Sequence, residues 1–141
     1  MVSAGEVIHQ ALERLKGTKI SVILRPQIDL VPNSADRVNM ARLVDEAKIR
    51  FAFSLSLSPG YTESQDTPLF QLAMLVRAGL ARDKALQALT LTPATMLGVD
   101  KQIGSVEAGK AANLIICDGD PFATATRFRQ VLVDGRPVYE G

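Results

Sequence analysis

Helical and extended patterns of apolar residues alternate along the first two thirds of this 141-residue chain. Residues 3–16 place apolar side chains at three- and four-residue intervals, which predicts an amphipathic helix that ends at Gly17. Ser3 and Glu6 fit a capping box at the start of that helix. The β-branched run at residues 19–24 then predicts a short strand.

The alternation of helix and strand continues after a polar loop. Residues 35–48 carry a second amphipathic stripe and predict a helix, and residues 51–57 predict a second strand. Two further helices are expected at residues 69–78 and 82–90. Strands separated by helices predict a parallel sheet with helical cover, so the fold class is α/β.

The strand at residues 51–57 separates large side chains from small ones. The large side chains are Phe51, Phe53, Leu55 and Leu57, and the small ones are Ala52, Ser54 and Ser56. Because side chains alternate across a strand, the large set faces helices and the small set faces a crowded interior, as in a barrel wall. A complete (β/α)₈ barrel needs about 250 residues. The chain therefore predicts about two of the eight β/α units.

The last third of the chain has a different character. Strands are expected at residues 105–106, 113–117, 129–133 and 137–139, and Asp134-Gly135 is the signal for a tight hairpin turn. We place the boundary near Gly98. It divides a barrel segment, residues 1–98, from a β-strand segment, residues 99–141.

The composition is that of a soluble globular domain, with 47% apolar and 22% charged residues and a formal net charge of +1. The basic residues are scattered, so neither nucleic acid nor a membrane surface is an expected partner. The chain has neither a membrane-length apolar run nor a signal sequence, so a cytoplasmic location is expected. The single cysteine, Cys117, lies in an apolar run and is expected to be a buried, inert thiol.

Four consecutive motifs carry a resemblance to a known family. They are ALQALTLTPATMLGV at residues 85–99, IGSVEAGKAANLII at 103–116, DGDP at 118–121 and VLVDGRPVY at 131–139. In this order and spacing they resemble the C-terminal signature of the amidohydrolase superfamily, closest to its imidazolonepropionase- and prolidase-like branch. The run LVRAGL at residues 75–80 is similar to the last barrel helix of that family.

The motifs themselves consist of structural residues. Gly104 and Gly109 permit tight turns. Thr92 is expected as the N-cap of a short helix that has Pro93 in its first turn, and Gly98 is expected to end that helix. Residues 85–139 therefore predict a scaffold.

The resemblance implies a metal-dependent hydrolase. Family members carry one or two divalent, zinc-like metals in a (β/α)₈ barrel and hydrolyse non-peptide C–N bonds with a metal-activated water. Their metal ligands are a His-x-His pair, two further histidines, often a lysine, and an aspartate on the last barrel strand. A small β-domain is built from both chain ends, and residues 99–141 are expected to form its C-terminal strands.

This chain departs from that ligand pattern. His9 is its one histidine and is expected to lie on a helix surface, so a metal site with about three protein ligands is not expected within the chain. Ser56 falls at the position of the last-strand aspartate, where a serine hydroxyl is a poor ligand and a poor base. Asp66, ten residues downstream, is the nearest substitute carboxylate. No catalytic, metal or cofactor residue is thus expected here.

The sequence is compatible with three interpretations. The chain is the C-terminal fragment of an amidohydrolase and is inactive alone, or it is a non-catalytic relic that completes itself with a second copy or with the missing part of a barrel. The third is a small αβ binding module with a pocket at Ser54 and Ser56.

Overall fold

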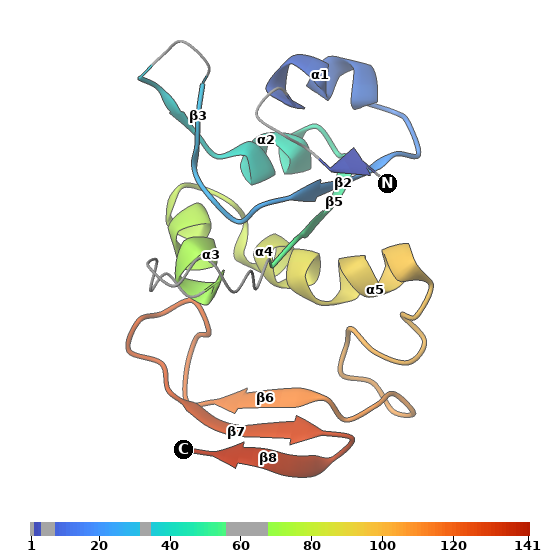
Figure 1. Ribbon diagram of the computed structural model, residues 1–141, viewed down its shortest axis with the longest axis vertical. Helices are drawn as coiled ribbons and strands as arrows, with labels where there is room; N and C mark the ends of the chain where they lie inside the picture. The colour runs from blue at the N-terminus through green and yellow to red at the C-terminus, as the bar shows by residue number, and fades with distance from the viewer. Residues whose placement is uncertain (1, 4–7, 32–34, 56–67) are drawn as a thin grey trace, which may run out of the picture.

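The computed structural model describes residues 2–3, 8–31, 35–55 and 68–141, and for residues 2–3, 8–10 and 68 it describes the backbone alone. Figure 1 shows an elongated molecule: an αβ part lies at one end, helices occupy the middle, and a second sheet forms the other end. The element order is βαβββαβαααβββ. The predicted α/β class is confirmed at this level.

A parallel sheet organises the first half of the chain. Its strands are β1 (Val2–Ser3), β2 (Ser21–Leu24) and β5 (Arg50–Phe53), in the order β1-β2-β5. Sequence patterns predicted two of these strands, and the third, β1, was missed. A two-residue strand has no hydrophobic period of its own and forms only because a distant strand pairs with it.

The backbone of Ser3 lies in β1 and pairs with Ile23 of β2. The predicted capping box needs the side chains of Ser3 and Glu6, which lie outside the described residues, so it stays a prediction. Helix α1 spans Ile8–Leu15. Gly17, two residues after the end of α1, has a left-handed φ of 71° and confirms the predicted stop.

Aligned large side chains of β2 and β5 form the centre of the hydrophobic core. In the parallel register Val22 lies beside Phe51 and Leu24 beside Phe53, and all four are buried. Helices α1, α2 (Met40–Glu46), α3 (Pro68–Arg77) and α4 (Arg82–Leu89) add most of the remaining core side chains, and the segments that follow α2, α3 and β6 (Leu114–Cys117) add Ile49, Leu80 and Phe122. These are Leu12, Met40, Ala41, Val44, Ile49, Leu72, Ala73, Leu75, Leu80, Ala85, Ala88 and Phe122.

On the opposite face of the sheet, the described part of β5 carries a small side chain. Ala52 pairs with Ile23 and is buried, yet it does not belong to the core cluster. This confirms the predicted division between large and small faces for the described part of β5. The strand ends at Phe53, and Ser54 and Leu55 are exposed, so the predicted strand was too long by at least two residues.

Helix α2 begins five residues later than predicted. Its N-cap is Asn39, whose Oδ1 accepts a hydrogen bond from the Arg42 amide at 3.1 Å. The preceding residues instead form an antiparallel pair of short strands, β3 (Asp29–Leu30) and β4 (Arg37–Val38). The apolar stripe predicted for residues 35–48 includes Val38, which belongs to that hairpin, so the helical pattern was extended too far.

Helices α4 and α5 (Leu91–Leu97) follow each other almost without a break. Thr90 occupies the boundary, and the prediction of Thr92 as N-cap was wrong, because residue 91 is already helical. Gly98 ends α5 with a left-handed φ of 74°, as predicted.

An antiparallel sheet closes the chain. It consists of β6 (Leu114–Cys117), β7 (Phe128–Val133) and β8 (Arg136–Glu140), and Asp134 and Gly135 form the predicted hairpin turn with φ of 48° and 76°. The strand predicted at residues 105–106 was wrong. Those residues form bends and coil, because two apolar positions between turns have no neighbouring strand to pair with.

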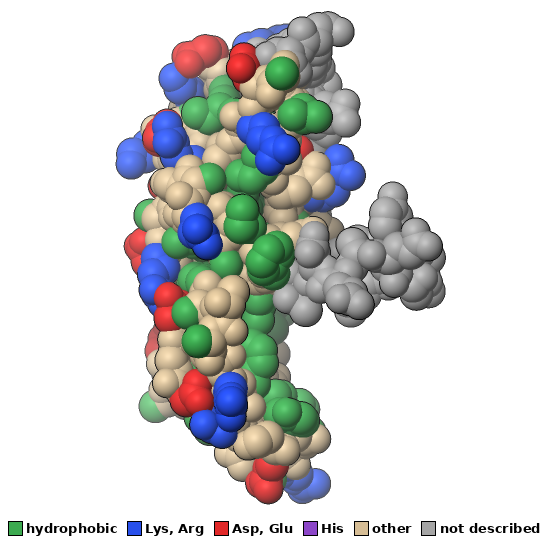
Figure 2. All heavy atoms as spheres, turned by 90° about the vertical axis from the view of Figure 1, so that its left-hand side faces the viewer, with side chains coloured by type: hydrophobic (Ala, Val, Ile, Leu, Met, Phe, Trp, Pro, Cys, Tyr) green, Lys and Arg blue, Asp and Glu red, His purple; other side chains and the backbone are tan. Residues whose placement is uncertain are grey.

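The antiparallel sheet is poorly covered. All five residues of β8 are exposed, and β6 has the pattern intermediate, exposed, exposed, intermediate. Figure 2 shows apolar side chains at the surface toward this end of the molecule. For the same reason Cys117 is only half-buried, with its thiol donating to the Gly119 carbonyl at 3.2 Å, so the prediction of a buried thiol was wrong.

Candidate functional site

The carboxyl edge of the parallel sheet is the place where a (β/α) barrel carries its chemistry. There the Ser54 amide donates to the Leu24 carbonyl at 2.8 Å and extends the pairing of β2 and β5 by one residue. Ser54 itself is exposed. The chain segments that follow β2, from Arg25, and β5, from Leu55, therefore both begin at the same edge of the sheet.

The segment that leaves β2 contains one carboxylate. Gln27 donates from Nε2 to Asp29 Oδ1 at 2.7 Å, and the Gln27 amide donates to the Arg25 carbonyl at 2.9 Å. A carboxylate paired with an amide can orient a polar group. It does not supply the set of three ligands that a catalytic metal needs.

The sequence-predicted site residues fall mostly outside the described residues. Ser56 and Asp66 both do, and so does the side chain of His9, whose backbone lies in the first turn of α1. Their predicted roles therefore stay predictions. Among residues 2–3, 8–31, 35–55 and 68–141, no group of three or more His, Cys, Asp or Glu side chains is placed to hold a metal ion.

The start of the second motif, residues 103–110, forms a loop that packs tightly against α5 and is called the signature loop below. A Cβ atom on Gly104 would lie 2.7 Å from the Ala94 Cβ and 3.1 Å from the Leu91 Cα. Gly104 also has a φ of 97°, which side chains of L residues rarely adopt. The loop therefore approaches α5 more closely than any residue with a side chain allows.

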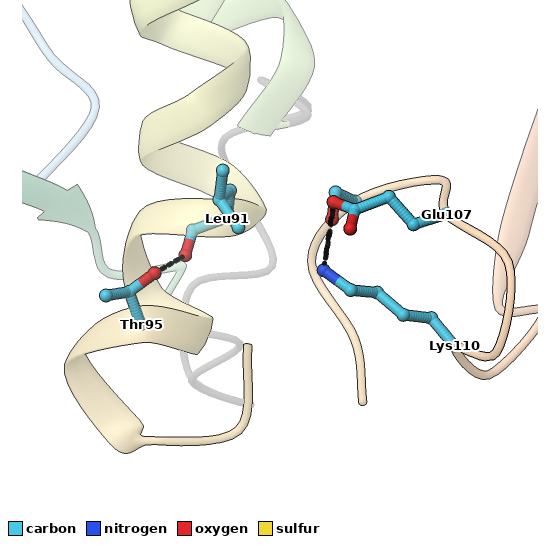
Figure 3. Close-up of polar contacts among 5 residues, drawn as sticks. Leu91, Thr95, Glu107 and Lys110 are labelled. Atoms are coloured by element: carbon cyan, nitrogen blue, oxygen red, sulfur yellow. Dashed lines mark hydrogen bonds and ion pairs between the residues drawn. The ribbon is translucent and has the colours of Figure 1, made fainter. Parts of the chain in front are cut away.

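A three-residue polar cluster holds the same loop (Figure 3). The Lys110 ammonium donates to Ser105 Oγ at 2.5 Å and lies 3.2 Å from Glu107 Oε1. The Ser105 hydroxyl donates to Glu107 Oε1 at 2.6 Å. The hydrogen bond from Ser105, then the hydrogen bond and charge of Lys110, hold the pKa of Glu107 below its ordinary value. Only 11% of the Lys110 side chain is exposed, so its donors are directed into the loop.

The DGDP turn joins the antiparallel sheet to the helices. Asp120 forms an ion pair with Arg82 of α4 and accepts a hydrogen bond from the Phe122 amide at 2.8 Å. The Phe122 ring is buried in the core cluster, with the Arg82 guanidinium 5.9 Å from its centre. The sequence signal for this contact was the motif itself, but its partner on α4 could not be found from spacing alone.

Asp118, the residue after β6, connects the end of β6 to the start of β7. Its Oδ1 accepts from the Arg127 amide at 2.9 Å, and its Oδ2 lies 2.8 Å from the Arg129 guanidinium. The backbone hydrogen bond from Arg127, followed by the charge of Arg129, holds the pKa of Asp118 below its ordinary value. Within the motif residues at 85–139, Gly104, Asp118 and Asp120 thus make contacts that connect loops, strands and helices.

No helix among the described residues has the length and apolar composition required to cross a membrane.

Comparison with known proteins gives a consistent result over nearly the whole chain. The sequence model of the amidohydrolase family matches residues 6–139. The imidazolonepropionase of Shouchella clausii is 30% identical over 107 residues, which cover 72% of this chain and 24% of that protein. The N-substituted formamide deformylase of Arthrobacter pascens is 47% identical over 64 residues, which cover 41% of this chain and 12% of that protein.

The fold is also shared with a solved structure. An amidohydrolase from Thermotoga maritima superposes with a TM-score of 0.79 at 24% identity, covering 99% of this chain and 36% of that one. The chain thus spans about a quarter of the imidazolonepropionase and about a third of the solved amidohydrolase. The family match over residues 6–139 and the shared fold show that this chain belongs to the amidohydrolase family, on its imidazolonepropionase-like side.

Proposed function

We propose that this chain is the C-terminal part of an amidohydrolase that hydrolyses a non-peptide C–N bond in an amide or cyclic amide. Members of the family hydrolyse C–N bonds, and the relatives include imidazolonepropionases and a deformylase. The observation that carries the proposal is the coverage: nearly all of this chain matches the family, while it spans only about a quarter of the imidazolonepropionase. On this proposal the reaction needs segments beyond these 141 residues.

The chain's own contribution is the wall and the support of the site. β2 and β5 would form neighbouring strands of the barrel wall. Ala52 would lie on the interior face, and Phe51 and Phe53 would pack against helices. The signature loop and the DGDP turn would hold the small β-domain against those helices through Gly104 and Asp120.

The metal would be held by side chains that other segments supply. Amidohydrolases are generally metal-dependent, and a bound divalent ion lowers the pKa of its water so that hydroxide forms near neutral pH. One histidine cannot provide the usual set of about three protein ligands, and Ser56 stands where the family pattern has its aspartate. We therefore propose that the isolated chain has no hydrolase activity.

Two observations test this proposal. The purified chain, loaded with zinc, is assayed with an N-substituted formamide and with a cyclic amide, and no hydrolysis above the buffer rate is expected. Turnover that is lost on chelation would contradict the proposal. The coding sequence upstream of Met1 is expected to encode a His-x-His pair, and a stop codon there in an intact genomic context would argue against the enzyme.

A substitution sharpens the role of Ser56. In a longer form that includes the upstream histidines, Ser56→Asp is expected to raise turnover by restoring a carboxylate ligand and base. Ser54→Asp serves as the matched control because it adds the same charge two residues earlier on the same predicted face. Equal effects of the two substitutions would contradict the assignment of Ser56.

A non-catalytic role is the second candidate, because the exposed faces of the antiparallel sheet favour it. Ile115 and Val138 are each 62% exposed, which is costly for a sheet that stands alone. In this case the chain would complete itself with a second copy or with the missing part of a barrel. Sedimentation tests it: an assembly at micromolar concentration is expected, and a compact, well-folded monomer would contradict it.

A further inference from the structure

Three cationic residues line one cavity at the amino end of β5. They are Lys48 from the turn after α2, Arg50 at the start of β5, and Lys84 of α4. The cavity has a volume of about 250 Å³ and is open to solvent. None of the three forms an ion pair or side-chain hydrogen bond with another described residue, so their positive charges are unpaired within the described structure.

Further polar residues line the same cavity. Gln87 and Thr92 provide neutral hydrogen-bonding groups, and Asp45 is the one carboxylate among the lining residues. Three positive charges against one negative charge leave the cavity electropositive. This contrasts with the chain as a whole, in which basic and acidic residues nearly balance and the net charge is +1.

The backbone at Lys48 is held in a conformation that lysine does not favour. Helix α2 ends in a Schellman motif, in which the Lys48 amide donates to the Asp45 carbonyl at 2.9 Å and the Ile49 amide to the Val44 carbonyl at 3.1 Å. This geometry gives Lys48 a φ of 59°. Glycine is the usual residue at such a position, since it has no Cβ to clash with the backbone.

Other helix ends in the same chain follow the usual rule. The left-handed residues after α1, α3 and α5 are Gly17, Gly79 and Gly98, so Lys48 is the exception. A lysine in the last helical turn would complement the helix dipole without any backbone strain. Dipole complementarity therefore does not account for a lysine at the left-handed position, where Lys48 lines the cavity.

Lys84 is also placed against a local preference. It lies in the first turn of α4, near the positive end of the helix dipole, where a cation is unfavourable and a carboxylate is preferred. Arg82, in the same turn, has Asp120 as a compensating partner, whereas Lys84 has none among the described residues. Two of the three cations thus occupy positions where their charge or backbone is disfavoured locally.

We propose that this cavity binds a small oxyanion, either inorganic phosphate or the phosphate group of a small phosphorylated metabolite. Lysine and arginine are the residues that recognise phosphate oxygens, and amide and hydroxyl donors complete such sites. A volume of about 250 Å³ lies below the roughly 300–1,000 Å³ of pockets that take drug-sized ligands, which favours a small group. The bound anion would compensate the unpaired charges of Lys48 and Lys84.

The site is separate from the proposed reaction centre. Arg50 begins β5, so the cavity lies at the amino end of the strand, whereas Ser54 follows its carboxyl end. Barrel enzymes place their chemistry at the carboxyl ends and use the opposite face for stability. Anion binding therefore stands or falls independently of the hydrolase proposal.

Titration of the full chain with inorganic phosphate tests the site. Amide chemical shifts are followed at constant ionic strength, with chloride as the balancing anion, so that general screening stays fixed. Saturable shifts confined to residues 45–51, 84–88 and 92 are expected at millimolar phosphate. The absence of saturable shifts at these residues would overturn the proposal.

Three substitutions make the test specific. Lys84→Gln and Lys48→Gly are each expected to weaken phosphate binding about threefold, and Asp45→Asn is expected to strengthen it about threefold, as for single exposed charges. Lys101→Gln, which removes an exposed lysine outside the cavity, is the matched control and is expected to leave binding unchanged. An equal loss in Lys101→Gln would show nonspecific attraction and would overturn the site.

A second titration identifies the source of the anion. Glycerol 3-phosphate is compared with inorganic phosphate under the same conditions. Tighter binding of the ester supports a phosphorylated metabolite, and tighter binding of the inorganic ion supports free phosphate. Failure of both to bind overturns the proposal, even if the chain folds as described.

Discussion

The parallel sheet β1-β2-β5 turns its large side chains into a helix-covered core, whereas the antiparallel sheet β6-β7-β8 leaves most of its side chains exposed. Both sheets are rich in apolar residues, so composition does not explain the difference. Helices that lie between the strands of the first sheet and after its last strand pack on its Phe51 and Val22 face. The second is made of hairpin-connected strands, which pair with one another but bring no covering layer with them.

The contrast separates two requirements that a sheet must meet. Backbone pairing depends on neighbouring strands, and the chain supplies these for β6, β7 and β8 within 27 residues, from 114 to 140. Burial depends on a second layer, and among the described residues Phe122 and Asp120, which follow β6, connect this sheet to the core and to α4. The exposed sheet is therefore the region where an additional segment or partner would contribute most.

The largest expected effect lies in the covered region. Leu72→Ala removes a side chain with no exposed surface from the centre of the core, and it is expected to lower the free energy of unfolding by about 3 kcal/mol. Leu97→Ala is the matched control because Leu97 is 69% exposed, and about 0.5 kcal/mol or less is expected. Urea denaturation measures both, and equal losses would contradict the described core.

The second effect tests the close approach of the signature loop to α5. Gly104→Ala combines a left-handed φ with a clash against Ala94, and it is expected to cost about 2–3 kcal/mol of unfolding free energy. Gly109→Ala has a φ of 90° but open space around the new Cβ, so about 1 kcal/mol is expected. The difference between the two variants in denaturant measures the packing cost alone. A Gly104→Ala variant as stable as Gly109→Ala would show that the loop stands away from α5.

A smaller effect of opposite sign is expected at the end of α2. Lys48→Gly removes the strain of a left-handed lysine and is expected to raise the free energy of unfolding by about 1 kcal/mol. Thermal unfolding without phosphate, at constant salt, measures the change. Lys48→Ala provides the control. It removes the charge but keeps the backbone strain, so no gain in the free energy of unfolding is expected.

The smallest effect concerns pH and the exposed sheet. Because the folded pKa of Asp118 is lowered, by the Arg127 backbone hydrogen bond first and the Arg129 charge next, its ionised form stabilises the fold at neutral pH. That contribution is present above the unfolded pKa and is lost as the pH falls below about 4 through the folded pKa. Asp118→Asn is expected to flatten the fall of the melting temperature between pH 5 and about pH 3, compared with the parent chain. An unchanged slope would contradict the role of this carboxylate.

The sequence predicted those features that depend on local chemistry. Period-two alternation located β5, and glycines marked the helix ends at Gly17 and Gly98. The Asp134-Gly135 turn was recognisable because few residues adopt two successive left-handed conformations.

Features that depend on distant partners were missed or misplaced. Strand β1 exists because β2 pairs with it, and the β3–β4 hairpin displaced the predicted start of α2 to Asn39. The burial of Cys117 was overestimated because an apolar run does not reveal whether a second layer covers it. The cavity at Lys48, Arg50 and Lys84 was not foreseen, since its residues come from three separate elements.

Metal analysis of the purified chain tests the central proposal most directly. Elemental quantification after expression in medium supplemented with zinc, iron and manganese is expected to find far less than one divalent ion per chain, because these 141 residues contain a single histidine. A stoichiometric ion that survives dialysis, together with hydrolysis of an amide by the same sample, would contradict the account.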